Sequence, residues 1–199
     1  MNYFGTSEHG GTHVDAPSHF FEGGMRTHNV PMENLVGPGV IIDVKEKAKK
    51  DVDYRVTIAD VVEWEANFGR IQNGAIVIMN SGWHSRYPNK KLVLNTDDFD
   101  DHTTFHFPSW HADTALWLID NRSVKAVGVD TPSNDYGQST AFIVHRILAK
   151  NSIIGVENVA NLDAIPQIGS TIFLPVIKLH DGSGGPVRVF ATVPLPSLL

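Results

Sequence analysis

The sequence contains no cysteine among its 199 residues. Without thiols there are no disulfides and no thiolate ligands, so a bound metal would be held by nitrogen and oxygen atoms, which favours zinc, manganese or iron. An excess of positive charge is also missing, because 22 Asp and Glu residues outnumber 16 Lys and Arg residues and the formal net charge is -6. This balance provides no footprint for nucleic acid or for an anionic membrane surface, and we expect neither as a partner.

Long apolar runs are absent as well. No stretch approaches the roughly 20 residues that cross a bilayer. The first residues, MNYFGTSEHGG, have neither the basic flank nor the apolar core of a signal peptide. These absences predict a cytoplasmic protein. Because no linker, repeat or low-complexity tract divides the chain, we expect residues 1–199 to form one domain.

Short apolar segments alternate with amphipathic ones along the chain. Four β-branched segments are typical of strands buried on both faces, namely residues 39–44, 74–79, 124–129 and 152–156. Helical patterns lie between them at residues 57–65, 111–119 and 139–148, with Thr57 and Ser139 as expected N-caps. Two further strands are expected at residues 172–177 and 187–193, joined through residues 181–186. This order predicts an α/β fold, a mixed β-sheet with flanking helices.

Residues 9–19 read HGGTHVDAPSH and concentrate groups that bind metals. Three histidines and one aspartate all stand at odd positions, so they would share one face of an extended backbone. The two glycines after His9 and the proline beyond Asp15 oppose a helix, and Gly11 leaves space between neighbouring imidazoles. We therefore predict that His9, His13 and Asp15 bind one divalent cation at about 2.0–2.2 Å. The alternative is a chance cluster of ordinary surface or core histidines.

The same segment carries a resemblance to a known family. It matches throughout the signature H-x-G-T-H-x-D-x-P-x-H of the cyclase-type metal-dependent hydrolases, which include bacterial kynurenine formamidase and isatin hydrolase. The resemblance continues in GVDTPSND at residues 128–135, in His145 followed twelve residues later by Glu157, and in GSGGPVRV at residues 182–189. The chain therefore resembles this family over nearly its whole length.

The resemblance implies roles for particular residues. His19 would be the general acid/base. The metal ligands would be His9, His13 and Asp15, joined in members with two ions by His145 and Glu157. Asp15 would then bridge the two ions. Isatin-hydrolase-like members are thought to use a single manganese, so the resemblance implies zinc or manganese, as one ion or two.

Fold and assembly are implied in the same way. The fold would be the swivelling β/β/α type, consistent with the mixed sheet expected from the patterns. Relatives assemble as dimers or larger, so a homodimer or higher homo-oligomer is expected, with the apolar tail at residues 193–199 as a candidate contact. Family members usually carry some tens of residues before the signature, including an early strand and a loop that closes the pocket. Because the signature begins here at His9, we expect that N-terminal segment to be missing.

The expected activity is hydrolysis of a C–N bond other than a peptide bond, in an aryl formamide or cyclic amide resembling N-formylkynurenine or isatin. A divalent ion lowers the pKa of bound water from 15.7 toward about 7 and makes it a nucleophile at neutral pH. His19 would carry the proton from that water to the leaving nitrogen. The ion would also stabilise the oxyanion that develops on the carbonyl.

Two aromatic segments are candidates for the walls of a substrate pocket. They are residues 81–87 and 105–111, from which we predict substrate contacts by Trp83, Phe107 and Trp110 with a flat aromatic amide. Core packing is the alternative for all three, since large aromatic residues are usually just buried. A third segment offers groups that either orient the site or form an Asx-type turn, namely Asp130, Thr131, Ser133 and Asp135.

Two other functions compete with hydrolysis. The first is a family member that retains a metal or ligand site but has lost turnover with its N-terminal segment. The second is an iron oxygenase, because His9, His13 and Asp15 alone satisfy the pattern of two histidines and one carboxylate. The additional pair of His145 and Glu157 and the acid/base His19 argue against the oxygenase.

Overall fold

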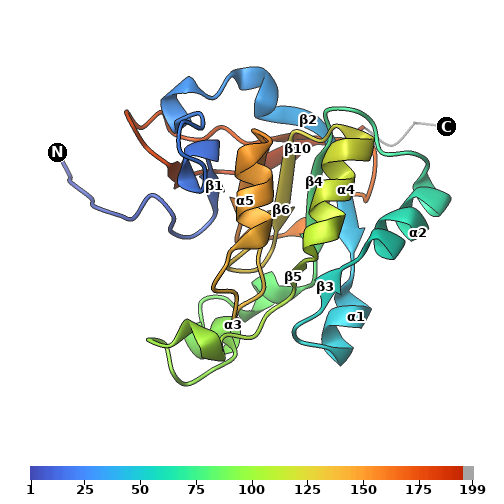
Figure 1. The fold of residues 1–199 in the computed structure, drawn as a ribbon, viewed down its shortest axis with the longest axis horizontal. Coiled ribbons are helices and arrows are strands. Elements are labelled where there is room, and N and C mark those ends of the chain that lie inside the picture. The colour runs from blue at the N-terminus through green and yellow to red at the C-terminus, as the bar shows by residue number, and fades with distance from the viewer. Residues whose placement is uncertain (195–199) are drawn as a thin grey trace.

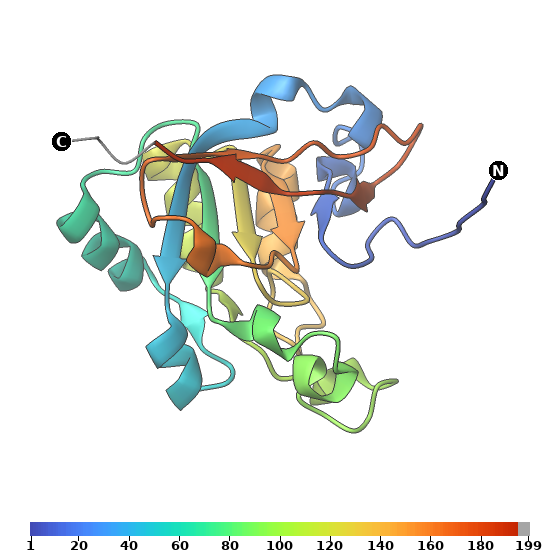
Figure 2. The ribbon, with the colours of Figure 1, turned by 180° about the vertical axis from the view of Figure 1, so that it is seen from behind.

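The computed structural model describes residues 1–194. The apolar tail from residue 195 onward, expected above to contact a second subunit, lies outside the described residues. One eight-stranded sheet runs through the described chain in the order β10-β8-β2-β4-β6-β7-β1-β9. A small second sheet pairs β3 (Arg55–Val56) with β5 (Ser109–Trp110). Residues 1–7 are exposed and extend away from this body, as Figures 1 and 2 show.

The centre of the large sheet is parallel. It consists of β2 (Val36–Asp43), β4 (Ile76–Asn80), β6 (Ala126–Val129) and β7 (Ile154–Glu157). Every residue of β4, β6 and β7 is buried, as expected for strands that are covered on both faces. The four strands predicted from unbroken apolar character are therefore confirmed, with ends shifted by up to three residues.

The flanks of the sheet are antiparallel, which confirms the mixed topology. On one side β8 (Ser170–Phe173) pairs with β2, and β10 (Phe190–Thr192) pairs with β8. On the other side β1 (His13–Asp15) lies between β7 and β9 (Gly184–Pro186). The expectation that residues 181–186 merely join two strands is wrong, because residues 184–186 form a strand of their own on β1.

Helices cover one face of the sheet. These are α2 (Ile58–Phe68), α4 (Ala112–Arg122) and α5 (Ile143–Lys150), and Figure 1 shows α4 and α5 in front of the strands. They bury an apolar core that includes Val61, Leu118 and Val144. The opposite face carries a second core. There the C-terminal part of the chain, orange-red to red in Figure 2, supplies much of the cover. Two shorter helices, α1 (Lys45–Lys50) and α3 (Lys90–Leu94), follow β2 and β4.

Of the two predicted N-caps, the one for α2 is confirmed and the one for α5 is wrong. Thr57 caps α2 in a capping box with Asp60, as expected. Ser139 does not cap α5, which begins four residues later at Ile143. The backbone amides of Val144 and His145 instead donate to the carboxylate of Asp135, at 3.0 Å each. A carboxylate nine residues before Val144, outside the helix, therefore satisfies two free amides of α5.

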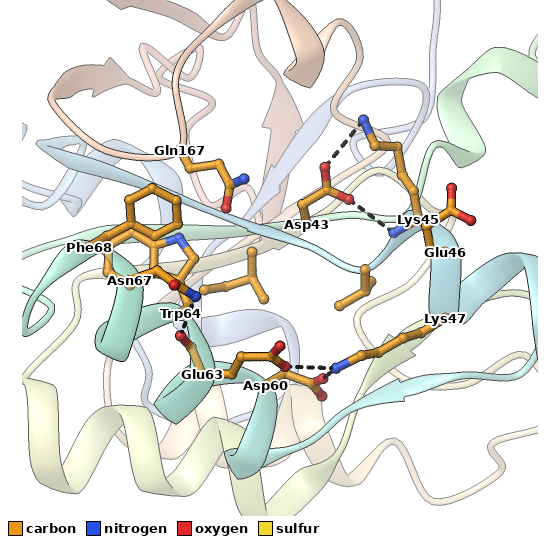
Figure 3. A pocket seen from close by; sticks show the side chains of 12 residues that line it. Asp43, Lys45, Glu46, Lys47, Asp60, Glu63, Trp64, Asn67, Phe68 and Gln167 are labelled. Atoms are coloured by element: carbon orange, nitrogen blue, oxygen red, sulfur yellow. Dashed lines mark hydrogen bonds and ion pairs between the residues drawn. The ribbon is translucent and has the colours of Figure 1, made fainter.

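A cavity of about 500 Å³ lies at the carboxyl end of β2, between α1 and α2 (Figure 3). Its polar lining includes Lys47, whose ammonium lies 2.5 Å from Asp60. Burial alone would raise the pKa of Asp60, but Lys47, Thr57 and Tyr54 hydrogen-bond to the carboxylate and hold its pKa below the usual value. Of the described residues that line this cavity, none is a predicted site residue. Across the described chain, every helix is too short or too polar to span a bilayer.

Candidate metal centre

Strand pairing assembles the heart of the candidate site. His13 and Asp15 alternate with Val14 on β1, so their side chains share a face while Val14 packs into the second core. The register places His13 directly opposite Glu157 on β7. The carboxylate of Glu157 is held in place by the backbone amide of Asn134, which donates to Oε1 at 2.9 Å. Three predicted ligands therefore meet where β1 joins the carboxyl end of the parallel strands.

His9 and His19 also lie at this site, but neither residue belongs to strand β1. Only residues 13–15 of the predicted extended segment form a strand. Gly11 has φ +63, a left-handed conformation that glycine adopts readily, and the resulting turn brings His9 back beside Asp15. His19 ends a short 3-10 helix, Pro17–His19. The expectation of one extended face over residues 9–19 is therefore wrong, although its side chains do converge.

Asp15 lies at the centre of the convergence. Its Oδ1 is 2.7 Å from His9 Nδ1 and 3.3 Å from His13 Nε2, while its Oδ2 is 3.4 Å from His145 Nε2. Glu157 faces the same two buried imidazoles, at 3.4 Å from His13 Nε2 and 3.0 Å from His145 Nε2. The structure thus brings all five predicted metal ligands together. Asp15 stands between one pair of ligands, His9 and His13, and another, His145 and Glu157.

Hydrogen bonds on the far side of two imidazoles set their orientation. His13 Nδ1 donates to the carbonyl of Gly11 at 2.9 Å, and His145 Nδ1 donates to Asp135 Oδ2 at 2.7 Å. With the proton on Nδ1, each ring directs the lone pair of Nε2 toward the buried carboxylates. This is the arrangement by which proteins orient histidine ligands of metal ions.

The two buried carboxylates of the centre make it a favourable site for a positive charge. Asp15 and Glu157 are each only 5% exposed. Burial by itself would lower the pKa of His13, yet the neighbouring Asp15 and Glu157 carboxylates raise it to about 8. Among the described residues, the buried Oδ2 of Asp15 has no hydrogen-bond partner. A divalent cation would meet both demands, because it satisfies the unpartnered oxygen and lets the imidazoles bind as neutral ligands. The residues present therefore fit such an ion.

His19 lies beside this centre, and its pKa is shifted in the opposite direction to that of His13. Its ring stacks on that of His9, with centroids 3.8 Å apart. Burial lowers the pKa of His19 to about 4, against a weaker opposing effect of Asp15. The imidazole is therefore neutral at pH 7 and can accept a proton. One of its nitrogens also lies within 4.8 Å of ligand atoms of His9 and Asp15, so proximity alone does not separate a proton carrier from a further ligand.

Two residues around His9 were not found from the sequence. Ser183 Oγ lies 3.0 Å from His9 Nε2, and the Glu8 carboxylate accepts from the backbone amide and hydroxyl of Ser183 at 2.8 and 2.9 Å. Gly184 makes room for the ring, since a Cβ there would lie 2.7 Å from His9 Nδ1. Residues 182–189 are among the segments that carry the family resemblance. Their contact with His9 had no local signal in the sequence.

The aromatic residues predicted to bind substrate separate into two groups. Phe107 lines a cavity of about 480 Å³ to which His13, His19 and Glu157 also contribute. Trp83 lines a neighbouring cavity of about 730 Å³, and His9 borders both. Trp110 is instead buried in the helix-side core.

Trp110 requires a correction. Its Nε1 donates to the carbonyl of Gly128 at 2.9 Å, and it belongs to neither of the two cavities at the metal centre. Pairing of β5 with β3 turns this side chain into the core, where its indole N–H finds a backbone partner. The prediction that Trp110 contacts substrate is therefore wrong.

Replacing Asp135 with Asn tests whether the residue behind His145 matters for metal binding. The substitution removes the charge that holds His145 Nδ1–H, so we expect the dissociation constant for the metal to rise by about 10- to 100-fold. Isothermal titration calorimetry with Zn²⁺ or Mn²⁺ provides the measurement. Asp113→Asn is the matched control, because Asp113 also lies beside a histidine, His111, but its side chain is 80% exposed. An unchanged dissociation constant in Asp135→Asn would contradict the orienting role.

Comparison with known proteins places these residues in a wider group. The profile of the family described as Putative cyclase matches residues 2–136. Isatin hydrolase of Roseibium aggregatum is 30% identical over 97% of this chain and 74% of its own length. Kynurenine formamidase of Salinibacter ruber is 28% identical over 92% of this chain and 74% of its own. A crystal structure of an isatin hydrolase bound to the product analogue thioisatinate superposes with a TM-score of 0.90 at 29% identity, covering 98% of this chain and 76% of that one.

Proposed function

The chain belongs to the Putative cyclase family, and from this premise we propose that it is a metal-dependent amidohydrolase. Its substrate would be an aryl formamide or a cyclic amide, and its reaction the hydrolysis of the C–N bond. The observation that carries the proposal is the meeting of His9, His13, His145 and two buried carboxylates at the wall of a cavity. The names of the relatives, isatin hydrolase and kynurenine formamidase, support the same class of substrate.

The proposed metal is zinc or manganese. His9, His13 and Asp15 would hold one ion, and His145 with Glu157 would hold a second, with the two oxygens of Asp15 facing one set each. A bound divalent cation would lower the pKa of a coordinated water and stabilise negative charge on the carbonyl oxygen. Imidazole and carboxylate ligands suit both metals.

The remaining chemistry falls to the side chains of the chain. His19, neutral and beside His9, would take a proton from the attacking water and return it to the leaving nitrogen. Asp135 and the carbonyl of Gly11 would keep His145 and His13 in the productive orientation. Burial of the carboxylates limits access of bulk water, which strengthens electrostatic interactions inside the site.

The cavity walls support an aromatic substrate. Phe107 and Phe142 line the cavity that includes His19, and Trp83 and Tyr87 line its neighbour. Flat aromatic side chains provide apolar contact with a planar ring, while the few polar groups fix its orientation. The proposed position places the amide at the metal centre and the ring among these side chains.

Metal removal tests the proposal directly. The protein would be assayed with N-formylkynurenine and isatin as purified, after chelation, and after Zn²⁺ or Mn²⁺ is restored. We expect hydrolysis of at least one amide that disappears on chelation and returns with metal, and metal analysis would count the ions. Metal binding with only background turnover would favour a binding protein. Oxygen consumption with Fe²⁺ would favour the oxygenase, and either result would refute the proposed hydrolase.

A further inference from the structure

A second group of two histidines and one aspartate lies apart from the centre described above. It consists of His28, His180 and Asp181, each of which offers a ligand atom within 4.8 Å of the others. His28 belongs to a short 3-10 helix, Thr27–Asn29, and the other two follow β8 in a loop. The blue segment around residue 28 and the orange-red loop around residue 180 lie side by side in Figures 1 and 2.

The ligand atoms of this group are spaced like those of the main centre, but its imidazole rings are oriented differently. The rings of His28 and His180 have centroids 5.0 Å apart and are nearly parallel, at 12°, whereas those of His9 and His13 are 5.3 Å apart and perpendicular. Binding of one ion would therefore turn the exposed His180 ring so that its nitrogen faces that of His28. Two imidazoles that bind one tetrahedral ion through nitrogens at about 2.0–2.1 Å place their ring centres about 5 Å apart. A carboxylate oxygen completes the set, since Asp181 Oδ2 lies 3.1 Å from His180 Nδ1. Both groups therefore present two imidazoles and a carboxylate at ligand spacing.

From this geometry we propose that His28, His180 and Asp181 bind one divalent transition-metal cation at the surface of the protein. Imidazole nitrogen with carboxylate oxygen selects cations such as Zn²⁺, Ni²⁺ or Cu²⁺ rather than Mg²⁺ or Ca²⁺. The side chains of His180 and Asp181 are 88% and 70% exposed, so water completes the coordination and the ion can exchange. This site is independent of the proposed hydrolase activity.

Hydrogen bonds already hold the two segments together. The amide of Thr27 donates to the carbonyl of Gly182 at 3.0 Å, and Arg26 Nη1 donates to the carbonyl of Asp181 at 2.9 Å. The amide of Asp181 donates to His28 Nδ1 at 3.1 Å, and coordination through that nitrogen would replace this hydrogen bond with a metal bond. The cation would thus clamp a preformed junction. The loop continues directly into Ser183, which contacts His9.

Metal stoichiometry in variants tests the site. His28→Asn and His180→Asn remove an imidazole while keeping a side-chain oxygen near the position of Nδ1, so the existing hydrogen bonds can persist. Equilibrium dialysis against Zn²⁺ followed by elemental analysis should find one ion fewer per chain in each variant than in the wild type. His111→Asn is the matched control, because His111 also lies beside an aspartate, Asp113, but outside both clusters, and should bind as many ions as the wild type. Equal zinc content in all four proteins would overturn the proposal.

Chemical modification of the wild-type protein tests the same site without a substitution, so the test holds even if a variant fails to fold. Diethyl pyrocarbonate modifies accessible imidazoles, and peptide mass spectrometry measures the modification at each histidine. Excess Zn²⁺ should protect His28 and His180 severalfold but leave exposed His111 unchanged in the same sample. Equal modification of His28 and His180 with and without zinc would refute the site. Neither measurement depends on turnover, so a failure here is distinguishable from a failure of the proposed hydrolase.

Discussion

Replacing Asp15 with Ala is expected to weaken metal binding and slow hydrolysis more than the other single substitutions considered. The carboxylate contacts His9, His13 and His145 at once, so its loss removes one ligand and the negative charge around which three imidazoles are arranged. Removing a residue that would bind the ion directly should weaken metal binding more than removing a residue that only orients a ligand. The metal dissociation constant should therefore rise by more than about 100-fold. Turnover should fall by at least about 10³-fold, because water in the site is no longer activated. Calorimetry and steady-state kinetics on the amide substrates measure the two effects.

Asp60→Ala is the matched control for that variant. Asp60 is also 5% exposed, but it accepts hydrogen bonds from Tyr54 and Thr57 and lies in α2 at the cavity of Figure 3. Its removal should lower the free energy of unfolding by about 1–3 kcal/mol, because buried donors lose their acceptor. Metal affinity should not change. If Asp15→Ala bound metal and turned over like this control, the proposed metal centre would be wrong.

His19→Asn should leave the metal in place and still lose most of the activity. The proposed role of His19 is proton transfer, and removal of a positioned acid/base group lowers the rate by about 10²- to 10⁴-fold. The loss should appear in kcat, since a proton carrier acts on the reaction rather than on binding. Metal analysis of the same sample decides between the two roles that proximity allows. A fall in metal content would make His19 a ligand.

His102→Asn controls for changes to the cavity itself. His102 lines the same cavity of about 480 Å³ as His19, but it belongs to a separate 3-10 helix, His102–Thr104. We expect its replacement to change KM modestly and kcat little. Comparable losses of kcat in both variants would show that the effect of His19 comes from the shape of the cavity, and the proton-transfer role would be abandoned.

Local patterns in the sequence were sufficient for the parts of the molecule that depend on neighbouring residues. Unbroken β-branched runs identified β2, β4, β6 and β7, because a strand covered on both faces must be apolar at every position. Alternation around Val14 placed His13 and Asp15 on one face, because successive side chains of a strand point to opposite sides. Thr57 was identifiable as a cap because its partner, Asp60, is three residues away.

Tertiary structure decided the features that depend on distant residues. The turn at Gly11 carries His9 off the strand, where Ser183, 174 residues later, meets its ring. Asp135 moves the start of α5, and the pairing of β5 turns Trp110 into the core. These contacts leave no periodic pattern in the sequence, because their partners are between nine and 174 residues apart and are brought together by tertiary packing. The residue types of the centre were thus evident from the sequence, whereas their geometry was set by which strands lie side by side.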